Sequence, residues 1–146
     1  MAFIVEKAVE LGVSCIHPLC SERAQAHHRK HFDEKNMHRY QKIIIAAAAQ
    51  SGINQLPSVC PPAALQELPW QDWEGVAQYY VCDPCAHGEG FHKSDQKRII
   101  FVGPEGGWSD QEILWLVDHH CQKMHLAQSV LRMETAVVAA LARAQV

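Results

Sequence analysis

The sequence lacks any apolar run close to the ~20 residues that a transmembrane helix needs. Its first residues, 1–7, do not form a basic leader followed by an apolar segment. Both common phosphate-binding motifs, GxxxxGK[ST] and GxGxxG, are also absent. We therefore expect a cytoplasmic protein without membrane contact, and we do not expect a nucleotide triphosphate site.

An excess of positive charge is missing too, because the net charge is −3 at pH 7. This argues against a protein that coats nucleic acid along its whole length. Basic residues nevertheless gather in one stretch: Arg23, Arg29, Lys30, Lys35, Arg39 and Lys42. The stretch could neutralise RNA phosphates and release counterions, or it could be a solvated helix face with a preceding loop. We take Arg23, Arg29 and Lys30 as candidate RNA-binding residues.

The chain has six cysteines but no recognisable metal-binding framework. Without a secretory signal they are expected to be reduced thiols. Cys82-x-x-Cys85 follows an apolar run, whereas a redox CxxC would open a helix. His87 could add a third zinc ligand, but no second CxxC closes the site. We favour thiols that pack near a strand end, and we predict no metal.

The length of 146 residues and the hydrophobic content of 48% suit one domain over residues 1–146. Helical and strand patterns alternate along it. We expect helices at 3–11, 33–50, 63–68, 109–120 and from 134 onward, and strands at 14–19, 76–82, 97–102 and 123–127. This order predicts an α/β fold with a mostly parallel sheet and helices on both faces.

Two of these helices contain segments that are apolar nearly all round. Residues 43–49 read Ile-Ile-Ile followed by four alanines, and we expect this segment to be buried. Residues 136–142 are apolar on every side. This last segment must be threaded into the core or covered by a second copy of the chain.

A glycine-rich turn connects a buried strand to a capped helix. Residues 99–102 run into Gly-Pro-Glu-Gly-Gly, and Ser109-x-x-Glu112 is a capping box. Such turns usually bind anions, but Glu105 would repel a phosphate. S-adenosylmethionine, which carries a sulfonium and an ammonium, fits better. The alternative is a tight turn whose glycines only adopt positive φ.

A second irregular loop lies within residues 125–136, "HLAQSVLRMETA", between a strand and the last helix. Both loops leave strands at what should be the carboxyl edge of a parallel sheet, where ligands bind in open α/β folds. We predict that they form one cleft.

These stretches resemble the RsmE family in order and spacing. They are "KAVELGVSCIHPLCSERA" (7–24), "QKIIIAAAAQSG" (41–52), "GPEGG" (103–107) and "LAQSVLRMETA" (126–136). RsmE proteins are bacterial methyltransferases of the SPOUT superfamily that methylate N-3 of a uridine in small-subunit ribosomal RNA. The resemblance implies a C-terminal trefoil knot, which is rare among folds, a homodimer, and S-adenosylmethionine bound between the two loops. The implied partner is ribosomal RNA or the small ribosomal subunit.

The resemblance also implies roles for individual residues. Arg132 would stabilise negative charge that develops on the uridine, and Glu134 would orient Arg132 or take the proton. Alternatively, both residues are charges that pair at a helix N-terminus. The implied cofactor-binding residues are Val102, Gly103, Pro104, Glu105, Gly106, Leu126, Ala127, Leu131, Thr135 and Ala136.

The chain departs from the family pattern in several places. The family usually has a preceding RNA-binding barrel and a first strand, and the sequence shows neither. Ala49, Ile53 and Ser129 replace charged family residues, and Met133 replaces a threonine. A second hypothesis is therefore a non-catalytic relative that dimerises and binds S-adenosylmethionine without turning over RNA.

Overall fold

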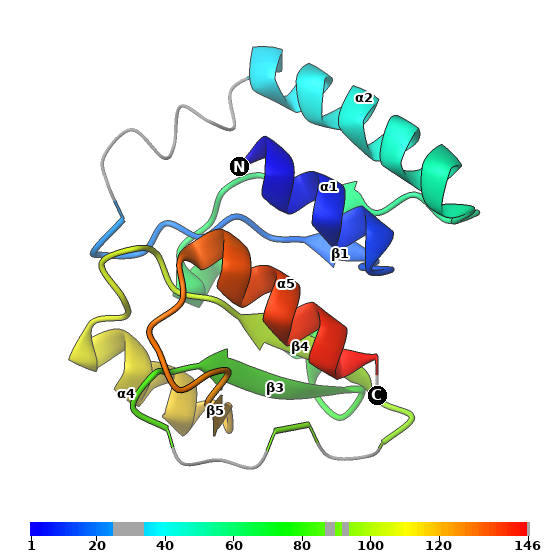
Figure 1. Cartoon of the computed structure of the whole chain (residues 1–146). Helices are drawn as coiled ribbons and strands as arrows, with labels where there is room; N and C mark the ends of the chain where they lie inside the picture. The colour runs from blue at the N-terminus through cyan, green and yellow to red at the C-terminus, as the bar shows by residue number, and fades with distance from the viewer. Residues whose placement is uncertain (25–33, 87–89, 92–93, 146) are drawn as a thin grey trace.

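The computed structural model describes residues 1–24, 34–86, 90–91 and 94–145 (Figure 1). In chain order the elements are α1 (Ala2–Glu10), β1 (Cys15–Ile16), α2 (Glu34–Ser51), β2 (Ser58–Val59), the 3-10 helix η2 (Leu65–Glu67), α3 (Trp70–Trp73), β3 (Ala77–Cys82), β4 (Lys97–Phe101), α4 (Asp110–Asp118), β5 (Gln122–Met124) and α5 (Met133–Ala144). Most expected elements are confirmed. The strand expected at 14–19 is shorter, and β2 and α3 were not predicted from the sequence.

The strands form two parallel sheets. One has the order β4-β3-β5, and the other pairs β1 with β2. Among the described residues β1 and β4 form no ladder. A cavity of about 850 Å³ lies between these two strands and is closed by parts of α1 and α5. Because the strands of both sheets are parallel and helices alternate with them along the chain, the predicted α/β fold with a mostly parallel sheet is confirmed.

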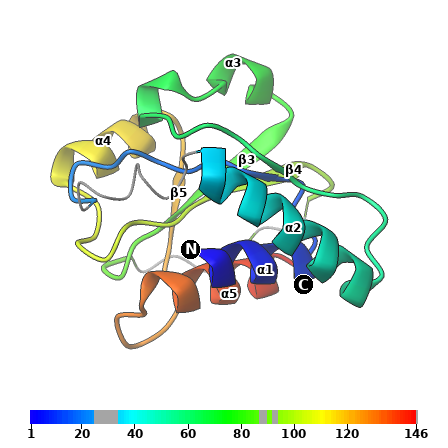
Figure 2. The same ribbon diagram turned by 90° about the horizontal axis from the view of Figure 1, so that it is seen from above.

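Side chains alternate across the larger sheet, so each face has its own core. Val81 and Phe101 point to the face covered by η2 and α4, where they cluster with Leu65 and Leu116. Tyr80 points to the other face and clusters with Met124 and Ala140 of α5. Figure 2 shows α3 and α4 on one side of the sheet and α1 and α5 on the other. Helices cover both faces, as predicted.

Helix α2 packs against α1 at the edge of the molecule, and this position decides how much of it is buried. Ile44, Ala47 and Ala48 are buried against Val5 and Val9 of α1. Ile45, on the opposite side of α2, is 57% exposed. The prediction that residues 43–49 are buried is therefore wrong for Ile45, Ala46 and Ala49, because in the described part of the chain α1 and the small sheet cover one side of this helix.

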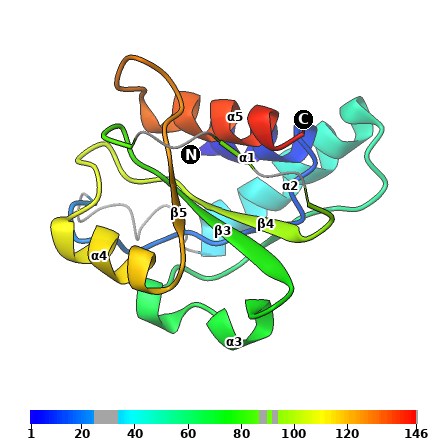
Figure 3. The same ribbon diagram turned by 90° about the horizontal axis from the view of Figure 1, so that it is seen from below.

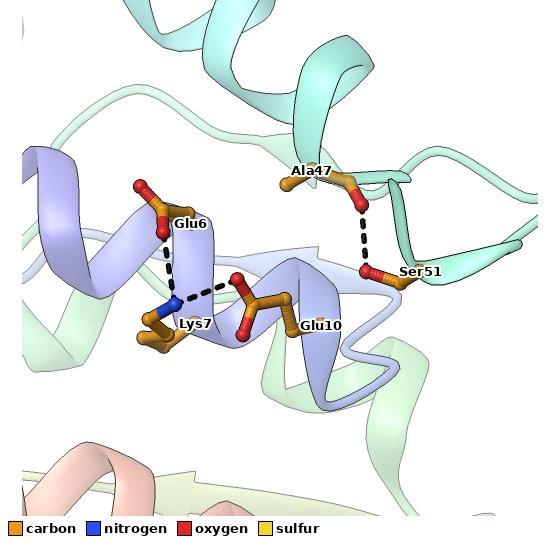
Figure 4. Close-up of polar contacts among 5 residues, drawn as sticks. All are labelled: Glu6, Lys7, Glu10, Ala47 and Ser51. Carbon is orange, nitrogen blue, oxygen red and sulfur yellow. Dashed lines mark hydrogen bonds and ion pairs between the residues drawn. The ribbon is translucent and has the colours of Figure 1, made fainter. Parts of the chain in front are cut away.

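Polar contacts hold the ends of α1 and α2 (Figure 4). Lys7 Nζ lies 2.9 Å from a Glu6 carboxylate oxygen and 2.7 Å from one of Glu10. These contacts raise the pKa of Lys7, and the hydrogen bond to Glu10 contributes more than the one to Glu6. The Ser51 hydroxyl donates to the Ala47 carbonyl at 2.6 Å, and Gly52 then ends the helix with φ +70°.

Helix α5 lies over the sheet and against α1, with its C-terminal end tied down by hydrogen bonds. Arg98 of β4 donates to the Ala144 carbonyl at 2.6 Å, and the Gln145 side chain donates to the Leu11 carbonyl at 2.6 Å. Ala140 is buried, but residues 136–139 are only half-buried. The chain thus covers one side of α5, and a covering second copy remains a prediction. Among the described residues, each helix is too short or too polar to span a bilayer.

Candidate functional site

The glycine-rich loop (residues 103–107) and the loop of residues 125–132 lie at the same edge of the sheet. We call them the carboxyl-edge loops. They follow β4 and β5, which are both parallel to β3 and flank it. Figure 3 shows the two loops at the same end of the sheet. Val102 and Leu126, where the loops begin, both pack on the hydrophobic cluster that includes Ala140. The predicted shared edge is confirmed, although β3 separates the two strands.

Glycine is required at different positions of the first loop for different structural reasons. Gly107 has φ +70°, and its N–H donates to the Pro104 carbonyl at 2.8 Å, which closes a tight turn. Gly103 and Gly106 instead permit close contacts. A Cβ on Gly103 would lie 3.1 Å from Trp108 Nε1, and one on Gly106 would lie 3.1 Å from the Arg23 carbonyl oxygen. Positive φ therefore explains Gly107 but not the other two.

A segment from the N-terminal part of the chain supports the glycine-rich loop. Arg23 Nη1 donates to the Trp108 carbonyl at 3.0 Å, beside the Arg23–Gly106 contact. Arg23 is exposed, so its candidate RNA-binding role remains a prediction alongside this structural contact. Arg29 and Lys30, the other two candidates, lie outside the described residues.

The buried carboxylate of Glu112 joins the start of α4 to the segment at Glu22. One oxygen accepts from the Ser109 N–H at 2.9 Å, while the Ser109 hydroxyl accepts from the Glu112 N–H at 3.2 Å. This confirms the predicted capping box. The other oxygen accepts from the Glu22 N–H at 3.1 Å. The Glu22 contact joins residues 90 positions apart, so no local sequence pattern could have found it.

The second loop ends in Arg132, a cation at the start of α5. Arg132 is the N-cap residue, is exposed, and its side chain makes no hydrogen bond or ion pair within the described part of the chain. Glu134 lies half-buried in the first turn of α5. The described structure has no Arg132–Glu134 ion pair, so the predicted orientation of Arg132 by Glu134 is not seen. A carboxylate is favourable at a helix N-terminus and a cation is not, which explains Glu134 structurally but leaves Arg132 unexplained.

The predicted cofactor-binding residues are arranged around these loops. Glu105, Gly106 and Thr135 are exposed, and the other predicted residues are half-buried: Val102, Gly103, Pro104, Leu126, Ala127, Leu131 and Ala136. The 850 Å³ cavity reaches Val102 and Pro104 of this set and Met133 at the start of α5. The remaining predicted residues do not line it, so the single-cleft prediction is supported only at this corner.

The cysteines of the CxxC stretch differ in environment. Cys82 is buried in β3, and burial raises the pKa of its thiol to about 12, whereas Cys85 is exposed. The Cys85 N–H donates to the Asp83 carboxylate at 2.9 Å. A buried, protonated thiol is a poor nucleophile, which supports packing over redox chemistry. His87 lies outside the described residues.

Residues 1–145 match the family model described as RNA methyltransferase domain. The chain belongs to this family. Curated relatives include Ribosomal RNA small subunit methyltransferase E of Buchnera aphidicola, which is 32% identical over 100% of this chain and 60% of the relative. The Mesomycoplasma hyopneumoniae protein of the same name is 29% identical over 93% of this chain and 60% of the relative. These names confirm the resemblance to the RsmE family.

Solved structures agree with this assignment to the RNA methyltransferase family. Lpg2936 of Legionella pneumophila, solved with the bound cofactor SAM, has a TM-score of 0.87 and 34% identity over 99% of this chain. Ribosomal RNA small subunit methyltransferase E of Neisseria gonorrhoeae, bound to S-adenosyl methionine, has a TM-score of 0.84 and 34% identity over the same share. This chain spans about 60% of each protein's length. The fold is thus that of SPOUT-type methyltransferases, while the trefoil knot remains a prediction.

Proposed function

We propose that this chain binds S-adenosylmethionine at the carboxyl-edge loops and methylates N-3 of a uridine in small-subunit ribosomal RNA. The observation that carries this proposal is that a glycine-rich loop and Arg132, which has no partner among the described residues, follow strands that end at one edge of the sheet. The SAM-bound structure of the Neisseria gonorrhoeae relative supports the cofactor. The names of the curated relatives support the RNA substrate.

The residues at the glycine-rich loop fit this cofactor. Trp108 Nε1 is buried beside Gly103 and has no hydrogen-bond partner among the described residues, so an acceptor atom of a bound molecule would satisfy it. Glu105 places an exposed carboxylate in the turn, where it would attract the sulfonium or ammonium. Half-buried Leu126 and Leu131 offer apolar surface for the adenine. When bound, the cofactor supplies an electrophilic methyl group.

The second loop supplies the groups that act on the uridine. N-3 of uridine is a poor nucleophile while it carries its proton. As that proton leaves, negative charge develops on the neighbouring carbonyl oxygens. Arg132, which has no competing partner in the described structure, would stabilise this charge through its forked donors. Glu134 would accept the proton.

Isothermal titration calorimetry with S-adenosylmethionine and S-adenosylhomocysteine tests the cofactor site. The parent chain should bind both. Glu105→Gln should weaken the binding of S-adenosylmethionine by up to about fivefold, the scale of an exposed ion pair. It should weaken the binding of S-adenosylhomocysteine less, because that compound has a neutral thioether in place of the sulfonium. Glu74→Gln, an exposed substitution at the end of α3, is the matched control and should change neither affinity. A parent chain that binds neither compound would refute the proposed site.

A second candidate function is cofactor binding without RNA turnover. Ala49 and Ser129 are exposed, and both are neutral where the family carries charge, as is half-buried Ile53. Lost charge weakens contacts with phosphates. This candidate predicts normal S-adenosylmethionine binding with no methyl transfer to small ribosomal subunits.

We also infer a homodimer built partly on α5 and the loop before it. Val130, next to α5, is 81% exposed, and α5 keeps half-buried apolar side chains along residues 136–139. Covering this surface with a second copy would bury apolar area, and each Å² buried would stabilise the dimer by about 25 cal/mol.

A further inference from the structure

Two thiols and an imidazole meet in the small sheet, away from the carboxyl-edge loops. Cys15 Sγ lies 3.4 Å from Cys60 Sγ and 3.2 Å from His17 Nε2. Cys60 Sγ lies 3.7 Å from the same nitrogen. This is the one group of at least three metal-ligating side chains found among the described residues. We call it the Cys-His-Cys cluster.

The parallel register of β1 and β2 brings these side chains together. Cys15 and His17 are two residues apart on one strand, so they lie on the same face of the sheet. Cys15 pairs with Ser58, and Ile16 pairs with Val59, which places Cys60 opposite His17. The Cys60 N–H donates to the Ile16 carbonyl at 2.9 Å and fixes this position. The backbone therefore sets the spacing of the ligands.

The spacing matches a thiophilic divalent ion. Zinc bonds of about 2.3 Å to sulfur and 2.0–2.1 Å to nitrogen place tetrahedral ligand atoms roughly 3.5–3.8 Å apart. The observed separations are 3.2, 3.4 and 3.7 Å. A point about 2.2 Å from all three atoms lies roughly 1 Å above their plane, as in a tetrahedral site. We propose that Cys15, His17 and Cys60 bind one zinc ion.

The surroundings suit such an ion. The cluster is half-buried, and the His17 and Trp73 rings pack in a T-shaped arrangement with their centroids 5.3 Å apart. The Ser58 hydroxyl donates to Cys15 Sγ at 3.1 Å and is exposed, so the cluster is open to solvent on that side. Solvent or this hydroxyl can supply the fourth ligand.

Binding would convert two neutral thiols into zinc-bound thiolates and release two protons to solvent, while the imidazole binds in its neutral form. Two thiolates neutralise the ion, so the half-buried site carries no net charge. A disulfide between Cys15 and Cys60 is the competing chemistry. It would require the sulfurs to approach from 3.4 Å to about 2.05 Å, and it would require an oxidant. Zinc binding requires neither.

Metal titrations of the full chain in reducing, chelator-free buffer test this proposal. Zinc bound after dialysis is counted by elemental analysis, and cobalt is used as the spectroscopic probe. The parent should bind one equivalent of either ion. The cobalt form should show strong visible bands of a four-coordinate site with thiolate-to-metal charge transfer.

Cys60→Ser should weaken zinc binding by more than about 100-fold, since loss of even an outer-shell partner costs 10–100-fold. Cys85→Ser, which removes an exposed thiol outside the cluster, is the matched control and should bind like the parent. His17→Cys keeps three ligands, so it should retain cobalt with stronger thiolate charge transfer, even if Cys60→Ser fails to fold. A parent that takes up no zinc, or a cobalt spectrum unchanged in His17→Cys, would overturn the proposal.

Discussion

At the scale of single residues, Arg132 holds a position that helix electrostatics disfavours. The N-terminus of a helix carries partial positive charge, so a cation there destabilises the helix unless another interaction offsets this cost. Within the described structure the guanidinium has no partner that offsets this cost. A role at the reacting uridine would explain why the sequence keeps an arginine there.

Arg132→Lys should therefore separate binding from catalysis. Lysine keeps the charge but lacks the forked donors, so we expect methyl transfer to fall by about 10²–10³. Affinity for S-adenosylmethionine should stay within a few-fold, because the glycine-rich loop is untouched. Tritium transfer to RNA and calorimetry measure the two quantities. Equal losses in both would place Arg132 in the cofactor site instead, and an unchanged rate would remove its proposed role.

Glu112 should contribute more to stability than a typical residue, because its buried carboxylate joins the capping box to Glu22. Glu112→Gln keeps the size of the side chain but replaces one acceptor oxygen with a donor. We expect the free energy of unfolding to fall by about 1.5–3 kcal/mol, the scale of a hydrogen bond to a charged group. Urea denaturation measures it. Asp110→Asn, an exposed change in the same first turn, is the control, and equal effects of the two would contradict this role of Glu112.

At the scale of elements, the glycine-rich loop is held by its own turn and by Arg23. Gly107→Ala places a Cβ in open space but at φ +70°, so the cost is backbone strain alone. We expect about 1–2 kcal/mol of lost stability by thermal or urea unfolding. Gly106→Ala differs, because its Cβ would press on the Arg23 carbonyl. A Gly107→Ala chain as stable as the parent would contradict the positive-φ turn.

The elements that local patterns could predict are those whose signals lie within a few residues. The capping box placed the start of α4, and the apolar runs placed β3 and β4 within a residue of their bounds. Strand β2 was missed because its two residues are held only by pairing with β1. The all-round burial expected for residues 43–49 was wrong because Ile45 faces away from α1, and sequence periodicity says nothing about which neighbours exist.

In the candidate site, too, local sequence signals could be predicted and contacts between distant parts of the chain could not. Residue patterns and the family resemblance located the carboxyl-edge loops, because a glycine-rich turn after a buried strand is a local signal. They could not show that Arg23 and Glu22 contact that loop, since these contacts join distant parts of the chain. The Cys-His-Cys cluster was missed for a related reason. Cys15-x-His17 gains meaning only once the register brings Cys60 beside it.

At the scale of the whole molecule, the exposed apolar surface near α5 predicts a two-fold dimer. Sedimentation velocity at micromolar concentration should give the dimer mass. Val130→Lys should raise the dissociation constant at least tenfold, because it would place a charge in the interface. Leu56→Lys replaces another exposed aliphatic side chain, which is 57% exposed and remote in sequence from α5, and it should leave the dimer intact. A monomeric parent, or equal dissociation by both variants, would contradict the proposed dimer.

We propose methyl transfer to uridine N-3 by groups on the carboxyl-edge loops. The most direct measurement incubates the chain with S-adenosylmethionine and small ribosomal subunits that lack the modification. The RNA is then digested to nucleosides for mass spectrometry, and Arg132→Lys is run in parallel. We expect one N3-methyluridine per subunit with the parent and far slower formation with the variant. Cofactor binding without any methylated nucleoside, or methylation at a different atom, would contradict it.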